Sequence, residues 1–262
     1  MTNLQNNSKP SSSTLGTLYL VPNTLGDIDR ESQLSWVLPQ EVISKSASLK
    51  YWVVENAKTS RAFLKAVSSL TPLCCPMQDM QMVEWRGPRS NIEPQQLIAP
   101  LLQGHDLGLM SEAGLPAIAD PGAEIVAAAH NAKIKVVPLT GPSSLMLALM
   151  SSGMNGQRFL FQGYLPIKNP ERSSTLKALE IESRKLNQTQ LWIETPYRNI
   201  GMLENALACL DAKSRLCVAI DLSLPTQLVL SMTTAAWKSW ISNNTEVLKS
   251  LDRRPAVFLL QA

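Results

Sequence analysis

The stretch of this chain best placed to do chemistry is a short loop, Ser111-Glu112-Ala113-Gly114, that follows the apolar run of residues 107 to 110. Asp120-Pro121-Gly122 comes next, before an alanine-rich segment. The pattern predicts a buried strand, a loop and a helix start, with Asp120 capping the helix and Pro121 in its first turn. Loops at the carboxyl ends of parallel strands are where open α/β sheets bind ligands. A tight crossover without a ligand explains the same stretch equally well.

Two further loops have the same character. Residues 22 to 27 follow the β-prone run of residues 16 to 21, and residues 141 to 144 follow the run of residues 134 to 137. Both loops are rich in Gly, Pro, Ser and other small or turn-forming residues. Such loops suit a ligand that is held mainly by backbone groups in a cleft.

Several common chemistries lack their motifs in this sequence. Neither Gly-x-Gly-x-x-Gly nor Gly-x-x-x-x-Gly-Lys-Ser/Thr occurs, which disfavours the standard dinucleotide fold and P-loop enzymes. The nucleophile elbow Gly-x-Ser-x-Gly is also missing, and the only two histidines, His105 and His130, offer little to a catalytic triad.

The cysteines and histidines do not form a metal-binding pattern. Cys74, Cys75, Cys209 and Cys217 contain no Cys-x-x-Cys spacing. We therefore expect no metal site, and we expect reduced thiols in a cytosolic protein.

Composition predicts a globular protein with no strong preference for a partner. The 262 residues are 45% hydrophobic and 17% charged, with a net charge of +3, which permits an anionic partner without requiring one. No apolar run approaches the roughly 18 residues of a membrane span, so we expect no membrane partner. Residues 1 to 14 are polar and are expected to form a disordered tail.

Strand and helix patterns alternate along the chain, which predicts an α/β fold. Besides the strands named above, β-prone runs occur at residues 49 to 54, 159 to 163, 190 to 194, 216 to 220, 227 to 230 and 256 to 260. Residues 71 to 96 show no regular pattern. We predict two α/β domains: residues 15 to 142 with a mostly parallel sheet, and residues 143 to 262 with a mixed sheet.

An ordered set of motifs resembles the tetrapyrrole methylase superfamily. The set comprises residues 16 to 19, 109 to 116, 120 to 122, 136 to 144, 159 to 168 with Arg172, and 193 to 198. The resemblance covers nearly everything from residue 15 to residue 262. Within the superfamily the chain resembles the branch that methylates a ribose 2'-hydroxyl of 16S ribosomal RNA.

The resemblance implies a two-domain α/β methyltransferase, usually a homodimer, that binds S-adenosylmethionine in the cleft between its domains. The positions that match the cofactor site are Pro22, Ser111, Glu112, Ala113, Gly114, Ser143 and Ser144. Glu112 suits an anion that faces the cationic part or the ribose hydroxyls of the cofactor. A solvated loop carboxylate is the alternative interpretation of this side chain.

The motif of residues 109 to 116 departs from the family pattern at two positions. Glu112 stands where the family usually has Asp, and Leu115 stands where it usually has Thr. The added methylene moves the carboxylate by roughly the length of one carbon–carbon bond. These departures indicate a divergent member of the branch.

Three basic residues match positions that would contact an anionic acceptor such as RNA phosphate: Lys168, Arg172 and Arg198. A solvated basic face is the alternative.

Methyl transfer depends mainly on aligning the acceptor oxygen, the methyl carbon and the sulfur. A general base helps where the acceptor hydroxyl must lose its proton, and the candidates are Glu55, Glu112 and Glu194. The sequence does not choose among them.

The sequence thus predicts a cytoplasmic methyltransferase whose partner is ribosomal RNA or the small ribosomal subunit. Two alternatives remain open at this stage. One is the same cofactor chemistry on a small molecule such as a tetrapyrrole, and the other is a catalytically silent cofactor-binding homologue.

Overall fold

The structure, a computed structural model, describes residues 15–26 and 30–262. The predicted tail, residues 1 to 14, lies outside the described residues. The described chain forms two compact units. The first holds residues 15–23 and 34–141, and the second holds 24–26, 30–33 and 142–262. The domain limits predicted from sequence remain a prediction.

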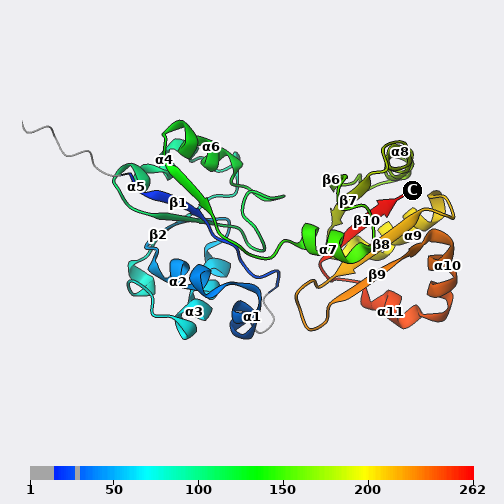
Figure 1. Ribbon diagram of the computed structural model, residues 1–262, viewed down its shortest axis with the longest axis horizontal. Helices are drawn as coiled ribbons and strands as arrows, with labels where there is room; N and C mark the ends of the chain where they lie inside the picture. Colours follow the sequence, from blue (N-terminus) through cyan, green and yellow to red (C-terminus); the bar gives the residue numbers. More distant parts are fainter. Residues whose placement is uncertain (1–14, 27–29) are drawn as a thin grey trace, which may run out of the picture. The chain divides into compact units, whose positions relative to one another are not determined.

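The first unit is built on a parallel sheet (Figure 1). Its described strands are β1 (Thr17–Leu20), β2 (Tyr51–Val54), β3 (Gln81–Glu84), β4 (Leu107–Met110) and β5 (Lys135–Pro138). Their order is β3-β2-β4-β1-β5, and every neighbouring pair is parallel. The carboxyl ends of all these strands therefore lie at the same end of the sheet. We call this end the carboxyl edge.

Helices cover both faces of this sheet, which explains why its central strands β2 and β4 carry no charged or hydrogen-bonding aliphatic side chains. The helices are α1 (Arg30–Val37), α2 (Gln40–Ser48), α3 (Ala57–Leu70), α4 (Pro94–Leu97), α5 (Ala99–Leu102) and α6 (Ala123–Asn131), with a 3₁₀ turn η1 (Met77–Asp79). In β2, Trp52 and Val54 pack with residues of α2 and α3, whereas Val53 packs with residues of α4, α5 and α6. Figure 1 shows α2 and α3 on the opposite side of the sheet from α4 and α6.

The second unit is built on a mixed sheet. Its described strands are β6 (Phe159–Tyr164), β7 (Thr189–Glu194), β8 (Arg215–Ile220), β9 (Leu228–Thr233) and β10 (Ala256–Gln261). In the order β6-β7-β10-β8-β9, the β6 and β7 pair is parallel and the other pairs are antiparallel.

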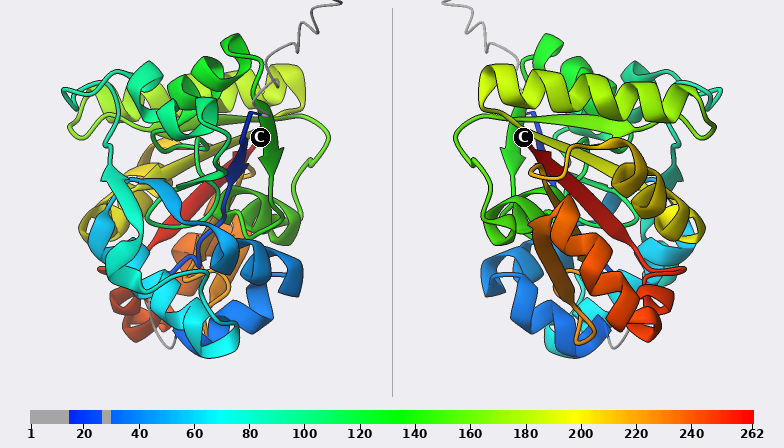
Figure 2. Two further views of the ribbon diagram at one scale, coloured as in Figure 1. Left: turned by 90° about the vertical axis from the view of Figure 1, so that its left-hand side faces the viewer. Right: turned by 90° about the vertical axis from the view of Figure 1, so that its right-hand side faces the viewer.

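Helices also lie on both faces of the mixed sheet. They are α7 (Ser144–Ser152), α8 (Glu171–Leu186), α9 (Asn199–Cys209), α10 (Thr234–Asn243) and α11 (Thr245–Ser250), with a 3₁₀ turn η2 (Pro196–Arg198). Trp192 and Phe258 stack at the centre of the face covered by α8, α9 and α10. Helix α7 packs on the other face, against Leu191 and Leu259. Figure 2 shows α9, in yellow, and α10, in orange, in front of the sheet in its right-hand view.

The predicted fold class, with one parallel and one mixed sheet, is confirmed, and the structure corrects some elements. Strand β3 lies in the region where no pattern was found, because its side chains are mostly exposed and give no apolar run. The apolar residues that recur at helical spacing between residues 235 and 251 lie on two helices that meet at Asn244. No helix among the described residues is long and apolar enough to cross a membrane.

Candidate functional site

The loops that follow β1, β2 and β4 lie next to one another at the carboxyl edge of the parallel sheet. In the strand register Met110 pairs with Val54, and Leu109 pairs with Leu20. The residues that leave these strands are therefore neighbours, although they are distant in sequence. We call residues 111–114, which follow β4, the β4 loop.

Asn23 holds the β4 loop from the side of β1. Its side-chain Nδ2 donates to the carbonyl oxygens of Ser111 at 3.3 Å and Glu112 at 2.8 Å. Its backbone N–H also donates to the carbonyl oxygen of Gly114 at 2.9 Å. Asn23 is fully buried, so these bonds satisfy a polar side chain that would otherwise destabilise the unit.

Glu55 holds the same loop from the side of β2. Its backbone N–H donates to the carbonyl oxygen of Met110 at 3.1 Å, and its Oε2 accepts the backbone N–H of Glu112 at 2.9 Å. The side chain of Glu112 is exposed. The β4 loop therefore has a fixed backbone and presents a free carboxylate.

The loops after β1 and β5 are in close contact at Pro22 and Gly141. A Cβ atom added at Gly141 would lie 2.2 Å from Cβ and 2.4 Å from Cγ of Pro22. Only glycine allows this approach. The backbone N–H of Leu139 also donates to the carbonyl oxygen of Leu20 at 3.0 Å, which continues the pairing of β1 and β5 into the loops.

Asp120 lies among the carboxylates of this edge and does not cap α6. The position before α6 is taken by Gly122 with φ of 144°, and no side chain caps the helix, so the predicted cap is wrong. The pKa of the Asp120 carboxyl is raised to about 7, chiefly by burial and then by the charges of Glu55 and Glu112, while the neighbouring Ser111 hydroxyl lowers it. The Ser111 Oγ is itself buried, with no partner at full hydrogen-bond geometry.

The raised pKa of Asp120 predicts a pH-dependent stability. Between about pH 4 and pH 7 the folded chain keeps a proton on Asp120 that the unfolded chain has lost, so the free energy of unfolding falls as pH rises through this window. Because the side chain retains some contact with water, we expect a loss of about 1 to 2 kcal/mol instead of the roughly 4 kcal/mol of a full shift.

Urea unfolding of the wild-type chain and of Asp120→Asn, at pH 4.5 and pH 8, measures this effect. Relative to wild type, the variant should have a higher unfolding free energy at pH 8 than at pH 4.5. An equal difference at both pH values would show that Asp120 titrates normally.

Ser143 and Ser144 belong to the second unit, at the start of α7. Ser143 is the N-cap of this helix, and its Oγ accepts the backbone N–H of Met146 at 3.4 Å. Ser144 is the first residue of the helix and is half-buried.

The three predicted substrate contacts also belong to the second unit. Lys168 is exposed between β6 and α8. Arg172 Nε donates to Oδ1 of Asn205 at 3.0 Å.

Arg198 forms a buried ion pair with Glu194. Its Nη2 and Nε lie 2.6 and 2.8 Å from Glu194 Oε1, and the same oxygen accepts the backbone N–H of Thr195 at 2.7 Å. Thr195 and Pro196 open the 3₁₀ turn η2, and α9 begins directly after this turn.

Sequence reasoning missed the role of Asn23 and Glu55 as anchors of the β4 loop. Their bonds span 89 and 57 residues, so no local pattern contains them. Among the described residues, no three His, Cys, Asp or Glu side chains are grouped as metal ligands.

Comparisons with known proteins fit this architecture. No family model matches the chain. Ribosomal RNA small subunit methyltransferase I of Synechocystis sp. is 29% identical over 209 residues, which cover 80% of this chain and 68% of that protein. The protein of the same name from Vibrio cholerae is 28% identical over 227 residues, which cover 87% and 72%.

Two solved structures share the fold. The methyltransferase CobJ has a TM-score of 0.57 at 14% identity and covers 94% of each chain. Uroporphyrin-III C-methyltransferase of Thermus thermophilus, in complex with S-adenosylhomocysteine, has a TM-score of 0.53 at 14% identity and covers 94% of this chain and 97% of that one.

The fold and the relatives together define the class of protein: this chain is a methyltransferase with the tetrapyrrole methylase fold, as its motifs predict. Within that class, the predicted similarity to the small-subunit ribosomal RNA methyltransferases is confirmed.

Proposed function

We propose that this chain transfers the methyl group of S-adenosylmethionine to a ribose 2'-hydroxyl of small-subunit ribosomal RNA. The observation that carries the proposal is the β4 loop, whose backbone is fixed by Asn23 and Glu55 while the Glu112 carboxylate stays exposed. The names of the curated relatives support RNA as the acceptor.

The carboxyl edge fits the cofactor chemically. S-adenosylmethionine carries a sulfonium and an ammonium group, and Glu55, Glu112 and Asp120 place carboxylates at this edge that favour cations. The buried Ser111 hydroxyl adds a polar atom without a well-aligned partner. The residues proposed to hold the cofactor are Pro22, Ser111, Glu112, Ala113, Gly114, Ser143 and Ser144.

The cofactor supplies an electrophilic methyl group bonded to a sulfonium sulfur. When the cofactor is bound, the acceptor hydroxyl would take this methyl group and would have to lose its proton. The hydroxyl proton passes to a base, for which we propose Glu55 in preference to Glu194. The Glu194 side chain is only 1% exposed and is engaged by Arg198, whereas Glu55 lies at the carboxyl edge.

The proposed acceptor contacts are Lys168, Arg172 and Arg198, with Lys168 the most accessible of the three. We also propose that the chain acts as a homodimer in the cytoplasm, where ribosomal subunits assemble.

Methyl transfer to small ribosomal subunits tests the function. Subunits from a strain that lacks the corresponding gene are incubated with the protein and methyl-labelled S-adenosylmethionine. Label should enter ribosomal RNA and remain in nucleotide linkages that resist alkali, since a methylated 2'-oxygen cannot attack its phosphate. Label that enters uroporphyrin III instead would replace RNA with a tetrapyrrole acceptor, and no transfer to either would contradict the proposed reaction.

Glu112→Ala tests the cofactor site. We expect S-adenosylmethionine to bind about tenfold more weakly, the effect of one charge-assisted hydrogen bond at a partly exposed position. Titration calorimetry measures the affinity. The matched control is Asp79→Ala, an exposed carboxylate just before β3 and so at the opposite edge of the sheet. Equal affinities of Glu112→Ala and Asp79→Ala would remove Glu112 from the site.

A further inference from the structure

A group of cations lies on the flank of the carboxyl edge, outside the site described above. Lys58 and Arg61 are in the first turns of α3, and Arg86 and Arg89 follow the end of β3. All four side chains belong to exposed residues. We call these four residues the cationic rim.

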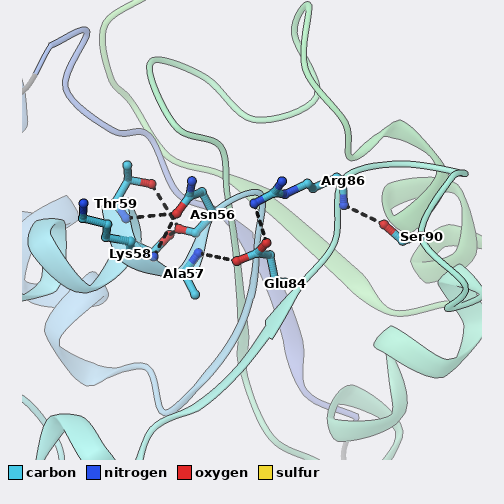
Figure 3. A network of polar contacts seen from close by, with 8 residues as sticks. Asn56, Ala57, Lys58, Thr59, Glu84, Arg86 and Ser90 are labelled. Carbon is cyan, nitrogen blue, oxygen red and sulfur yellow. Dashed lines mark hydrogen bonds and ion pairs between the residues drawn. The ribbon is translucent and has the colours of Figure 1, made fainter.

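The cationic rim is organised around Glu84, the last residue of β3. Glu84 Oε2 accepts the backbone N–H of Ala57 at 3.0 Å, and Oε1 lies 2.7 Å from Nη2 of Arg86 (Figure 3). The backbone N–H of Ala57 is the largest of the influences that lower the pKa of Glu84, followed by the charges of Arg86 and Arg61. One carboxylate thus sits among several cations, and the rim keeps a net positive charge.

Local hydrogen bonds fix the backbone of the rim. Asn56 caps α3 by accepting the N–H groups of Lys58 and Thr59, and the backbone N–H of Arg86 donates to Ser90 Oγ at 2.9 Å. Figure 3 shows both arrangements on either side of Glu84. The side chain of Arg86 remains 65% exposed, so its pairing with Glu84 orients the guanidinium without removing it from water.

The rim is adjacent to the proposed cofactor site. Val54 pairs with Glu84 on one side and with Met110 on the other, so the end of β3 is separated from the β4 loop only by the end of β2. Neighbouring strands lie about 4.8 Å apart, which puts the two strand ends about 10 Å from each other. The edge therefore carries carboxylates at its centre and cations at its flank.

We propose that the cationic rim binds the phosphate backbone of the acceptor RNA next to the reacting ribose. The inference rests on the proposed function and adds to it a contact surface on the first unit. The cations are spread over a helix start and the segment that follows an exposed edge strand, and all four belong to exposed residues. Spread and accessible Lys and Arg side chains are the usual means of contacting successive phosphates.

Neutralising the rim tests the proposal. The variant Lys58→Gln, Arg61→Gln and Arg86→Gln removes three charges, and it should fold because exposed ion pairs contribute little to stability. The matched control, Lys50→Gln, Lys133→Gln and Lys135→Gln, removes three exposed charges at or just before the amino ends of β2 and β5, on the opposite edge. Binding to small-subunit ribosomal RNA is measured from 50 to 200 mM KCl, and S-adenosylmethionine binding is measured by calorimetry.

We expect the rim variant to bind RNA at least tenfold more weakly. The slope of log affinity against log salt concentration should also be shallower, by the equivalent of about two to three phosphate contacts. Its cofactor affinity should stay within twofold of wild type, and the control should behave as wild type in both measurements. An unchanged salt dependence in the rim variant, or an equal loss in the control, would overturn the proposal. So would a loss of affinity for uroporphyrin III with RNA binding retained.

The two proposals have separate readouts. RNA binding that depends on the rim, in a protein that transfers no methyl group to ribosomal RNA, would refute the proposed reaction and support the rim. If the rim variant transfers methyl groups to RNA as fast as wild type at high salt and low RNA concentration, the proposed reaction is supported and the rim proposal is refuted.

Discussion

Gly141→Ala is expected to lose most of its affinity for S-adenosylmethionine and about 2 to 3 kcal/mol of unfolding free energy. The added Cβ would lie 2.2 Å from Pro22 Cβ and 3.2 Å from Leu38 Cδ2. Pro22 is a buried ring with a fixed φ, so it cannot rotate out of the way, and the two loops must separate. Pro22 is followed directly by Asn23, the anchor of the β4 loop, so the displacement reaches the proposed cofactor site.

Calorimetry with S-adenosylmethionine and urea unfolding measure the two effects. Gly156→Ala is the matched control, because a Cβ at Gly156 meets nothing within 4 Å. We expect at least a tenfold loss of affinity in Gly141→Ala and none in the control. Wild-type affinity in Gly141→Ala would show that the contact between these loops does not support the site.

Arg198→Met is expected to destabilise the second unit by about 3 to 5 kcal/mol. The substitution leaves Glu194, whose side chain is 1% exposed, without the cation that neutralises it. Glu194 Oε2 is already buried without a hydrogen-bond partner, so only the hydrogen bonds that Thr195 donates to Oε1 would remain to compensate the charge. Most of the stability should return in the double variant Arg198→Met with Glu194→Gln, because the uncompensated charge is then gone.

The same experiment separates a structural role of Arg198 from the predicted contact with RNA. Lys249→Met is the control, since Lys249 pairs with Glu246 on the surface, with both side chains more than two-thirds exposed. A variant Arg198→Met that is as stable as the control but binds RNA more weakly would assign Arg198 to the substrate and not to Glu194.

The sequence predicted most of the strands because apolar runs mark them, most clearly those that are largely buried, such as β4, β8 and β10. Strand β3 was missed for the same reason, since it lies at the sheet edge and its residues alternate weakly. The break at Asn244 is not marked in the sequence, because Trp237, Ile241 and Leu248 keep an apolar helical spacing across it.

The site was predictable as a set of loops but not as a set of contacts. Glu112 and Glu55 could be chosen from the sequence because each follows a strand. The hydrogen bond from the Glu112 backbone N–H to Glu55 Oε2 could not, because it depends on the register of β2 and β4. Asp120 was assigned to the helix cap because Asp before Pro commonly caps a helix. The chain instead turns through Gly122, and Asp120 lies among other carboxylates.

Pro22 and Gly141 lie where the chain passes from the first unit to the second. The backbone leaves the first unit after Asn23 and again after Gly141, and α1 carries it back between residues 33 and 34. The two segments that leave the first unit are held next to each other by the contact between Pro22 and Gly141. The chain thus passes between the units three times, after Asn23, after Gln33 and after Gly141, and no single cut yields both units whole. A fragment ending at residue 141 would keep residues 24–26 and 30–33 without the unit to which they belong.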